Sequence, residues 1–209
     1  WTERHGGEAP WLVTVRDERE QTRFIVDRLL ELHEEGTPLR EIAVLVRAGY
    51  LSADLEIELS NRRIPYEKWG GLKFLEAAHV KDLLSVLRWA QNLRDRVAGF
   101  RAIQLLAGIG PKTAARILDN IQAAPPGAAL LAEQPVPEGV RACWSEFSAL
   151  VEAAGAERAE WPASAEQVAR WYEAQMDRLY EDAVVRAADI QQLARLASTY
   201  PSRERFLTE

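Results

Sequence analysis

Short apolar runs in the first third of the chain predict β-strands, and the segments between them predict helices. The runs cover residues 11–15, 42–46 and 66–69. The run at 42–46 is continuously apolar, which is typical of a strand buried on both faces of a parallel sheet. Helices are expected over 17–36 and 52–61, and Asp17 with Glu20 forms a capping-box pattern at the start of the first. Alternating strands and helices imply right-handed β-α-β crossovers.

After Gly71 the apolar spacing becomes helical throughout. A helix ends near Asn92, a glycine turn follows, and residues 123–127 form the clearest break in the chain. Further helices are expected near 138–154, 164–181 and 183–199. Their aromatic residues are expected to fill the core: Trp144, Phe147, Trp171, Tyr172 and Tyr180. The predicted fold is therefore α/β over residues 1–105, with a small parallel sheet and flanking helices, followed by an all-helical subdomain over 106–209.

The stretch 105–118 predicts two helices joined by a tight glycine turn. Two of the three residues Gly108-Ile109-Gly110 lack a Cβ, which lets the backbone approach a neighbour closely. Pro111 suits the first helical position, and the free N–H groups of a helix start favour an anion. The segment closely resembles a helix-hairpin-helix motif that holds nucleic-acid phosphates; an ordinary interhelical turn is the alternative. The predicted DNA-binding residues are Gly108, Ile109, Gly110, Lys112, Thr113 and Arg116.

Charge and composition narrow the choice of partners. The net charge of −6 argues against a chain that coats nucleic acid non-specifically. The charge is uneven, since 94–119 holds five basic and two acidic residues, whereas 151–182 holds eight acidic and three basic ones. One cysteine, Cys143, and three histidines exclude an internal disulfide framework and a usual structural zinc site, so no metal site is expected. We expect neither a membrane span nor a signal peptide, and we therefore expect the protein to be located in the cytoplasm.

Arg47 directly follows the apolar run 42–46. The carboxyl end of a parallel strand faces the crevice where α/β proteins bind ligands. A guanidinium in that position can hold a phosphate bidentately and stabilise charge during phosphoryl transfer. The alternative from position alone is a strand-end arginine paired with a surface acid.

The order of several segments resembles one family. These segments are 41–47, Leu55-Glu56, Ile64-Pro65-Tyr66, 70–74, 80–88 and Gly108-Ile109-Gly110, with a weaker similarity at Arg186, Asp189-Ile190 and Leu193. The order is similar to the region around motif IV of the UvrD/Rep/PcrA superfamily 1 DNA helicases. The similarity is specific over about 11–121 and beyond that depends on helical character.

The resemblance implies a fragment that covers part of a RecA-like domain 2A and the inserted domain 2B. By position, Arg47 takes the role of the motif IV arginine that reaches the ATP γ-phosphate. The implied cofactor is ATP with Mg²⁺, and the implied partners are duplex DNA at a single-stranded junction, domains 1A and 1B, and the rest of domain 2A. The implied parent is a 3′-to-5′ translocase of the bacterial nucleoid with a role in repair or replication. The fragment alone is expected to be inactive, because a two-sided nucleotide site needs both sides.

The sequence departs from the family pattern next to Arg47. Val46 stands where the family often has an aromatic residue that stacks on adenine, and Tyr50 is the nearest aromatic that could replace it. Two other hypotheses stay open at this point. One is a stand-alone helix-hairpin-helix DNA-binding module without enzymatic activity. The other is a module that docks a protein partner through its helical half.

Overall fold

The computed structural model describes residues 9–68, 73–125 and 131–208. Contacts within the chain divide it into two compact units. The first comprises Trp1–Leu45 with Asp54–Glu67, and the second comprises Val46–Ala53 with Lys68–Glu209. The predicted border between residues 105 and 106 concerns the domains of a longer parent protein and stays a prediction. Within the described chain it falls between two helices of the second unit.

The first unit is built on two helices, α1 (Glu18–Glu34) and α2 (Ala53–Asn61), whose first residue belongs to the other unit. Asp17 caps α1, because its Oδ1 accepts a hydrogen bond of 2.8 Å from the Glu20 N–H. Gly36 follows the helix with φ 104°. Both predicted ends are thus confirmed. The apolar faces meet in a small core of Val26, Leu55 and Leu59, against which Ile25, Leu29, Leu30, Ile64 and Tyr66 pack.

The prediction of a parallel sheet is wrong. The described residues contain no β-strand, so the fold is all-helical rather than α/β. Residues 11–15 and 42–46 run without ladder hydrogen bonds, as do 66–68, and Trp69 lies outside the described residues. A strand takes its hydrogen bonds from a neighbouring strand, and within these residues none lies beside them. Most of the apolar side chains of 11–15 and 42–46 are accordingly exposed, with Leu12 97% and Leu45 95% accessible.

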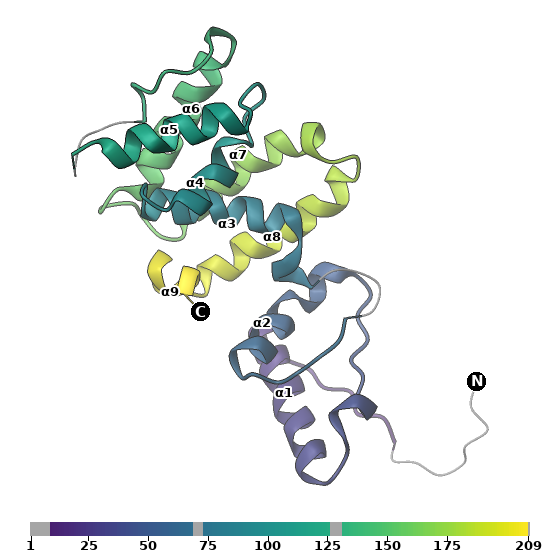
Figure 1. Ribbon diagram of the computed structural model, residues 1–209. Helices are drawn as coiled ribbons and strands as arrows, with labels where there is room; N and C mark the ends of the chain where they lie inside the picture. The colour runs from purple at the N-terminus through teal and green to yellow at the C-terminus, as the bar shows by residue number, and fades with distance from the viewer. Residues whose placement is uncertain (1–8, 69–72, 126–130, 209) are drawn as a thin grey trace. The chain divides into compact units, whose positions relative to one another are not determined.

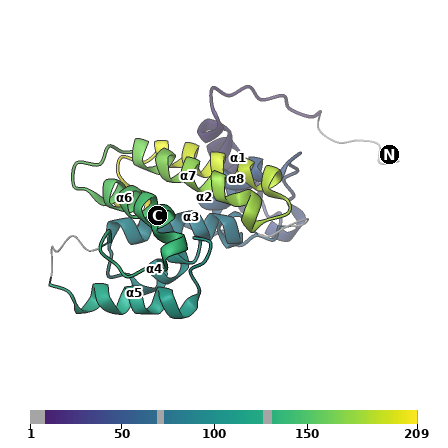
Figure 2. The same ribbon diagram turned by 90° about the horizontal axis from the view of Figure 1, so that it is seen from above.

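The second unit is a helical assembly around α3 (Ala78–Gln91), which contacts α4, α6, α7 and α8 (Figure 1). Its other elements are η2 (Gly49–Ser52), η3 (Phe74–Glu76), α4 (Arg96–Ile103), α5 (Pro111–Ala123), η4 (Glu138–Val140), α6 (Arg141–Gly155), α7 (Ala163–Leu179), α8 (Ala183–Ser198) and α9 (Arg203–Thr208). Figure 2 shows α4 and α5 together on one side of α3, with α7 and α8 on the other. The helices predicted near 138–154, 164–181 and 183–199 are therefore confirmed, with ends shifted by up to three residues.

Aromatic rings form the centre of this unit, as the sequence predicted. Phe147 stacks on Trp89 at 6.0 Å and on Trp171 at 4.8 Å between ring centroids, and Trp144 meets it edge-on at 6.1 Å. The buried Trp144 Nε1–H donates to the Leu131 carbonyl at 2.6 Å, which satisfies its polar atom. Tyr172 is also fully buried. These contacts tie α3, α6 and α7 into one core.

A buried carboxylate on α3 joins this helix to α4 and to α7 with its C-cap residue. Asp82 is 6% exposed, and its Oδ1 accepts from Arg101 Nε of α4 at 2.6 Å. Its Oδ2 accepts from the hydroxyls of Tyr172 and Tyr180, each at 2.7 Å. Burial, together with the hydrogen bonds to Asp82, raises the pKa of both tyrosines above the usual value. A fully partnered buried charge of this kind holds its helices in one arrangement.

Candidate nucleic-acid and nucleotide contacts

The glycine turn lies between α4 and α5, as predicted, but the first helix ends earlier than predicted, at Ile103, and residues 105–107 are not helical. Gly108 has φ 84°, in the left-handed region that disfavours residues with a Cβ. A Cβ at this position would lie 2.8 Å from Val140 Cγ2. Ile109 between the glycines is buried, whereas Gly108 and Gly110 are exposed. The isoleucine thus anchors the turn from inside and leaves its glycine backbone open to solvent.

The start of α5 carries N–H groups with no capping side chain. Gly110 is the N-cap residue and Pro111 occupies the first helical turn, and no side chain of the described residues caps the helix. The N–H groups of Lys112 and Thr113 come before the first residue whose N–H has an acceptor within the helix, Ala114, which donates to the Gly110 carbonyl at 3.0 Å. Such groups, with the helix dipole, suit an anionic ligand.

The basic residues around this turn differ in how firmly the protein holds them. Lys112 is exposed, and the described part of the chain offers it no ion pair or hydrogen bond. Arg116 donates to the Pro135 carbonyl at 3.0 Å, and Arg96 pairs with Asp119 at 2.6 Å. Arg101 is held by Asp82. The basic residues counted in the sequence do lie around the turn. Within the described residues, however, Lys112 is the one cation among the predicted DNA-binding residues that makes no ion pair or hydrogen bond.

Two residues that the sequence did not indicate hold the turn in place. Arg178 of α7 donates a hydrogen bond through Nη2 to the carbonyl of Leu105. Val140, just before α6, packs on Gly108. Neither could be found from sequence, because each lies more than 30 residues from the turn and no local pattern marks the contact. The hairpin is therefore positioned by α7 and the start of α6 rather than by its own helices alone.

Arg47 lies at the end of the apolar run, on the surface. The side chain is exposed, and no ion pair to an acid is found for it in the described residues. It directly precedes Ala48, whose backbone is extended (φ −143°, ψ 148°), and η2 then begins at Gly49. Val46 beside it is 44% exposed, and Tyr50 is half-buried. The guanidinium is thus available to a ligand outside this chain.

Metal binding and membrane insertion gain no support from the described residues. No group of three or more His, Cys, Asp or Glu side chains among them is arranged to hold a metal ion. None of the described helices is both long and apolar enough to cross a bilayer.

The described residues thus combine an exposed glycine turn before an uncapped helix with a solvent-facing arginine at the end of an apolar run. The chain belongs to the UvrD-like helicase C-terminal domain family, whose pattern matches residues 1–197.

Proteins similar to this chain include helicases from several bacteria. The chain is 35% identical over 114 residues to a DNA helicase II of Escherichia coli strain K12, and 32% identical over 114 residues to a DNA helicase II of Haemophilus influenzae. It is 32% identical over 118 residues to an ATP-dependent DNA helicase PcrA of Staphylococcus epidermidis. The matches cover 54–56% of this chain but only 16% of each relative.

Proposed function

We propose that the chain is part of an ATP-dependent DNA helicase, in which it supplies Arg47 to the ATP site and a DNA contact at the turn between α4 and α5. The observation that carries the proposal is the exposed glycine turn with its uncapped helix start, inside a chain of the UvrD-like family. Gly108, Ile109 and Gly110 shape the backbone, and Lys112, Thr113 and Arg116 add donors around a phosphate. By resemblance, the translocation is 3′ to 5′, and the parent protein acts in the cytoplasm, at the bacterial nucleoid.

The apolar run 42–46 fits the same proposal. Its side chains are exposed, since Val44 is 42%, Leu45 95% and Val46 44% accessible. Exposed contiguous apolar residues mark an interaction surface. We infer that this run is a contact surface for the rest of domain 2A, with Arg47 at the end of that surface.

ATP and Mg²⁺ then lie between this chain and domain 1A. The exposed guanidinium of Arg47 fits a phosphate contact from one side, and the described residues hold no cluster of metal ligands. Mg²⁺ would neutralise the phosphates when bound, on ligands from the other domains. Arg47 holds and orients the terminal phosphate from its own side. Domains 1A and 1B are accordingly partners, and the chain by itself is inactive.

The nucleotide half of the proposal is tested by Arg47→Ala in the full-length enzyme. We expect DNA-stimulated ATP turnover to fall by at least about 100-fold, with DNA affinity unchanged, because the side chain stabilises transferring charge. Arg40→Ala is the matched control, since Arg40 is another exposed arginine a few residues upstream. Turnover that stays within twofold of the control would remove Arg47 from the site.

The DNA half is tested by Gly110→Asp, which separates helix stability from phosphate binding. An aspartate at the N-cap stabilises α5 relative to glycine by roughly a few tenths of a kcal/mol, because it accepts from the N–H groups of the first turn. The same side chain occupies and repels the phosphate position, so duplex affinity falls and its salt dependence flattens. Lys112→Glu should act in the same direction, with Lys81→Glu at an exposed position of α3 as its control. Unchanged DNA binding by a stabilised Gly110→Asp protein would show that the turn is only structural.

A further inference from the structure

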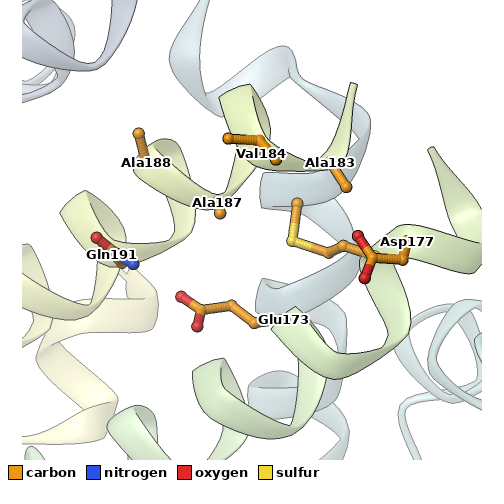
Figure 3. Close-up of a pocket in the computed structure, with 8 residues that line it drawn as sticks. Glu173, Asp177, Ala183, Val184, Ala187, Ala188 and Gln191 are labelled. Carbon is orange, nitrogen blue, oxygen red and sulfur yellow. The ribbon is translucent and has the colours of Figure 1, made fainter. Parts of the chain in front are cut away.

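The hairpin formed by α7 and α8 carries a groove that the proposed helicase function does not use. Figure 3 shows it, with acidic side chains from α7 on one side and small or apolar side chains from α8 on the other. Its volume is about 360 Å³. The lining residues are Glu173, Met176, Asp177, Ala183, Val184, Ala187, Ala188 and Gln191.

The wall from α8 is apolar and faces solvent. Val184 is 86% exposed, and Val184, Ala188 and Gln191 recur at the i, i+4, i+7 spacing of one helical face. Ala187 and Ala188 are short, so the backbone of another helix can approach α8 closely at this point. An exposed apolar stripe beside small residues is the kind of surface into which an amphipathic helix places its apolar side chains.

The wall from α7 is negatively charged. Glu173 and Asp177 stand one helical turn apart, about 6 Å along the axis of α7. Within the described part of the chain neither carboxylate takes part in an ion pair or a hydrogen bond. Two arginines on these helices have other partners, since Arg178 donates to Leu105 and Arg186 pairs with Asp182. The two carboxylates therefore offer unpaired negative charge to whatever lies in the groove.

We propose that this groove docks a cationic amphipathic helix from a partner protein. Its apolar residues, three or four apart, would cover Val184, Ala187 and Ala188, and lysines or arginines at the same spacing would pair with Glu173 and Asp177. Charge excludes the other occupants. Nucleic acid would bring phosphates to two carboxylates, and a second copy of this chain, joined through a symmetric contact, would bring the same two carboxylates to each other.

The test uses the full-length protein and a fluorescein-labelled synthetic peptide of 18 residues. In the peptide, leucine recurs every three or four residues, lysine fills one flanking side, and alanine fills the rest. Anisotropy titrations should show binding to the wild type. The double variant Glu173→Lys/Asp177→Lys should weaken binding at least about tenfold, and Val184→Asn about fivefold, because each removes one kind of contact.

Matched controls separate the groove from general attraction of a basic peptide to an acidic protein. Glu166→Lys reverses one charge at an exposed site of α7 outside the groove and is compared with Glu173→Lys and Asp177→Lys taken singly. Val185→Asn makes the same polar change as Val184→Asn at the neighbouring position. Each control should shift the dissociation constant less than about twofold. A scrambled peptide of equal composition should bind at least about tenfold more weakly, since its two faces no longer align.

Several outcomes would overturn the proposal. One is no peptide binding to the wild type, and another is equal weakening by Glu166→Lys and by the groove variants. A third is concentration-dependent dimerisation in sedimentation experiments that Val184→Asn abolishes and the peptide does not compete with, which would assign the groove to a second copy of the chain. None of these outcomes bears on Arg47 or the turn after α4, so failure here leaves the helicase proposal intact.

Discussion

Replacing Gly108 with alanine tests whether the turn between α4 and α5 is set by backbone conformation and by close contact with Val140. The φ of 84° costs an L-residue roughly 1–2 kcal/mol. The new Cβ would lie 2.8 Å from Val140 Cγ2, so the valine must leave its rotamer, at about 0.5–1.5 kcal/mol. Together, Gly108→Ala should lower the free energy of unfolding by about 1.5–3.5 kcal/mol.

A double-mutant cycle with Val140→Ala separates the two contributions. Val140→Ala removes the atom that the new Cβ would meet, so in that background Gly108→Ala should cost only the conformational part, about 1–2 kcal/mol. The measurement is urea unfolding monitored through tryptophan fluorescence, because Trp89 and Trp144 are buried in the same unit and report on its unfolding.

Gly110→Ala supplies the matched control at the other end of the turn. Gly110 has φ −90°, and a Cβ there would have nothing within 4 Å. Alanine lowers the conformational entropy of the unfolded chain, which stabilises the fold, but it is a poorer N-cap than glycine. The two effects oppose each other, so Gly110→Ala should change the free energy of unfolding by no more than about 0.5 kcal/mol. Equal effects of the two alanine substitutions, or a cost of Gly108→Ala that Val140→Ala leaves unchanged, would refute the reasoning.

Three further predictions concern the stability of the two units. Asp82→Ala should destabilise the protein by about 3 kcal/mol in thermal or urea unfolding, because two tyrosine hydroxyls lose their buried acceptor and Arg101 loses its ion-pair partner. A loss of stability below about 1 kcal/mol would contradict the importance of this buried network. Burial raises the pKa of Tyr172 above its unfolded value, so the stability that its neutral form gives is complete below about pH 10 and is lost as the pH rises further. Between pH 9 and 11.5, the free energy of unfolding should therefore fall less steeply with pH in Tyr172→Phe than in the wild type. Parallel curves for the two proteins would show that Tyr172 does not cause the loss of stability. Asp17→Ala should cost about 1 kcal/mol through loss of the α1 cap, measured as a shift in urea midpoint, and Asp17→Asn should restore most of it.

The sequence predicted the elements that depend on local chemistry. The cap at Asp17 and the glycine end of α1 were confirmed, because side-chain capping and a positive φ are decided within a few residues. The helices of the second unit follow from apolar spacing, and the aromatic core follows from the same spacing. The glycine turn belongs to this group, because Gly108 has a positive φ, which a glycine backbone adopts without strain.

The predicted sheet failed for a physical reason at residues 42–46. Their apolar pattern records a preference for extended backbone, but a strand exists only when another strand accepts and donates its hydrogen bonds. The described residues supply no such neighbour, so Leu45 faces solvent instead of a sheet. The sequence by itself determined α1, the longer helices of the second unit, the cap at Asp17 and the position of the glycine turn. Only the tertiary structure decided which cations stay available, that Asp82 gathers Arg101 and two tyrosines, and that Arg178 holds the turn, because these contacts join residues that no local pattern connects.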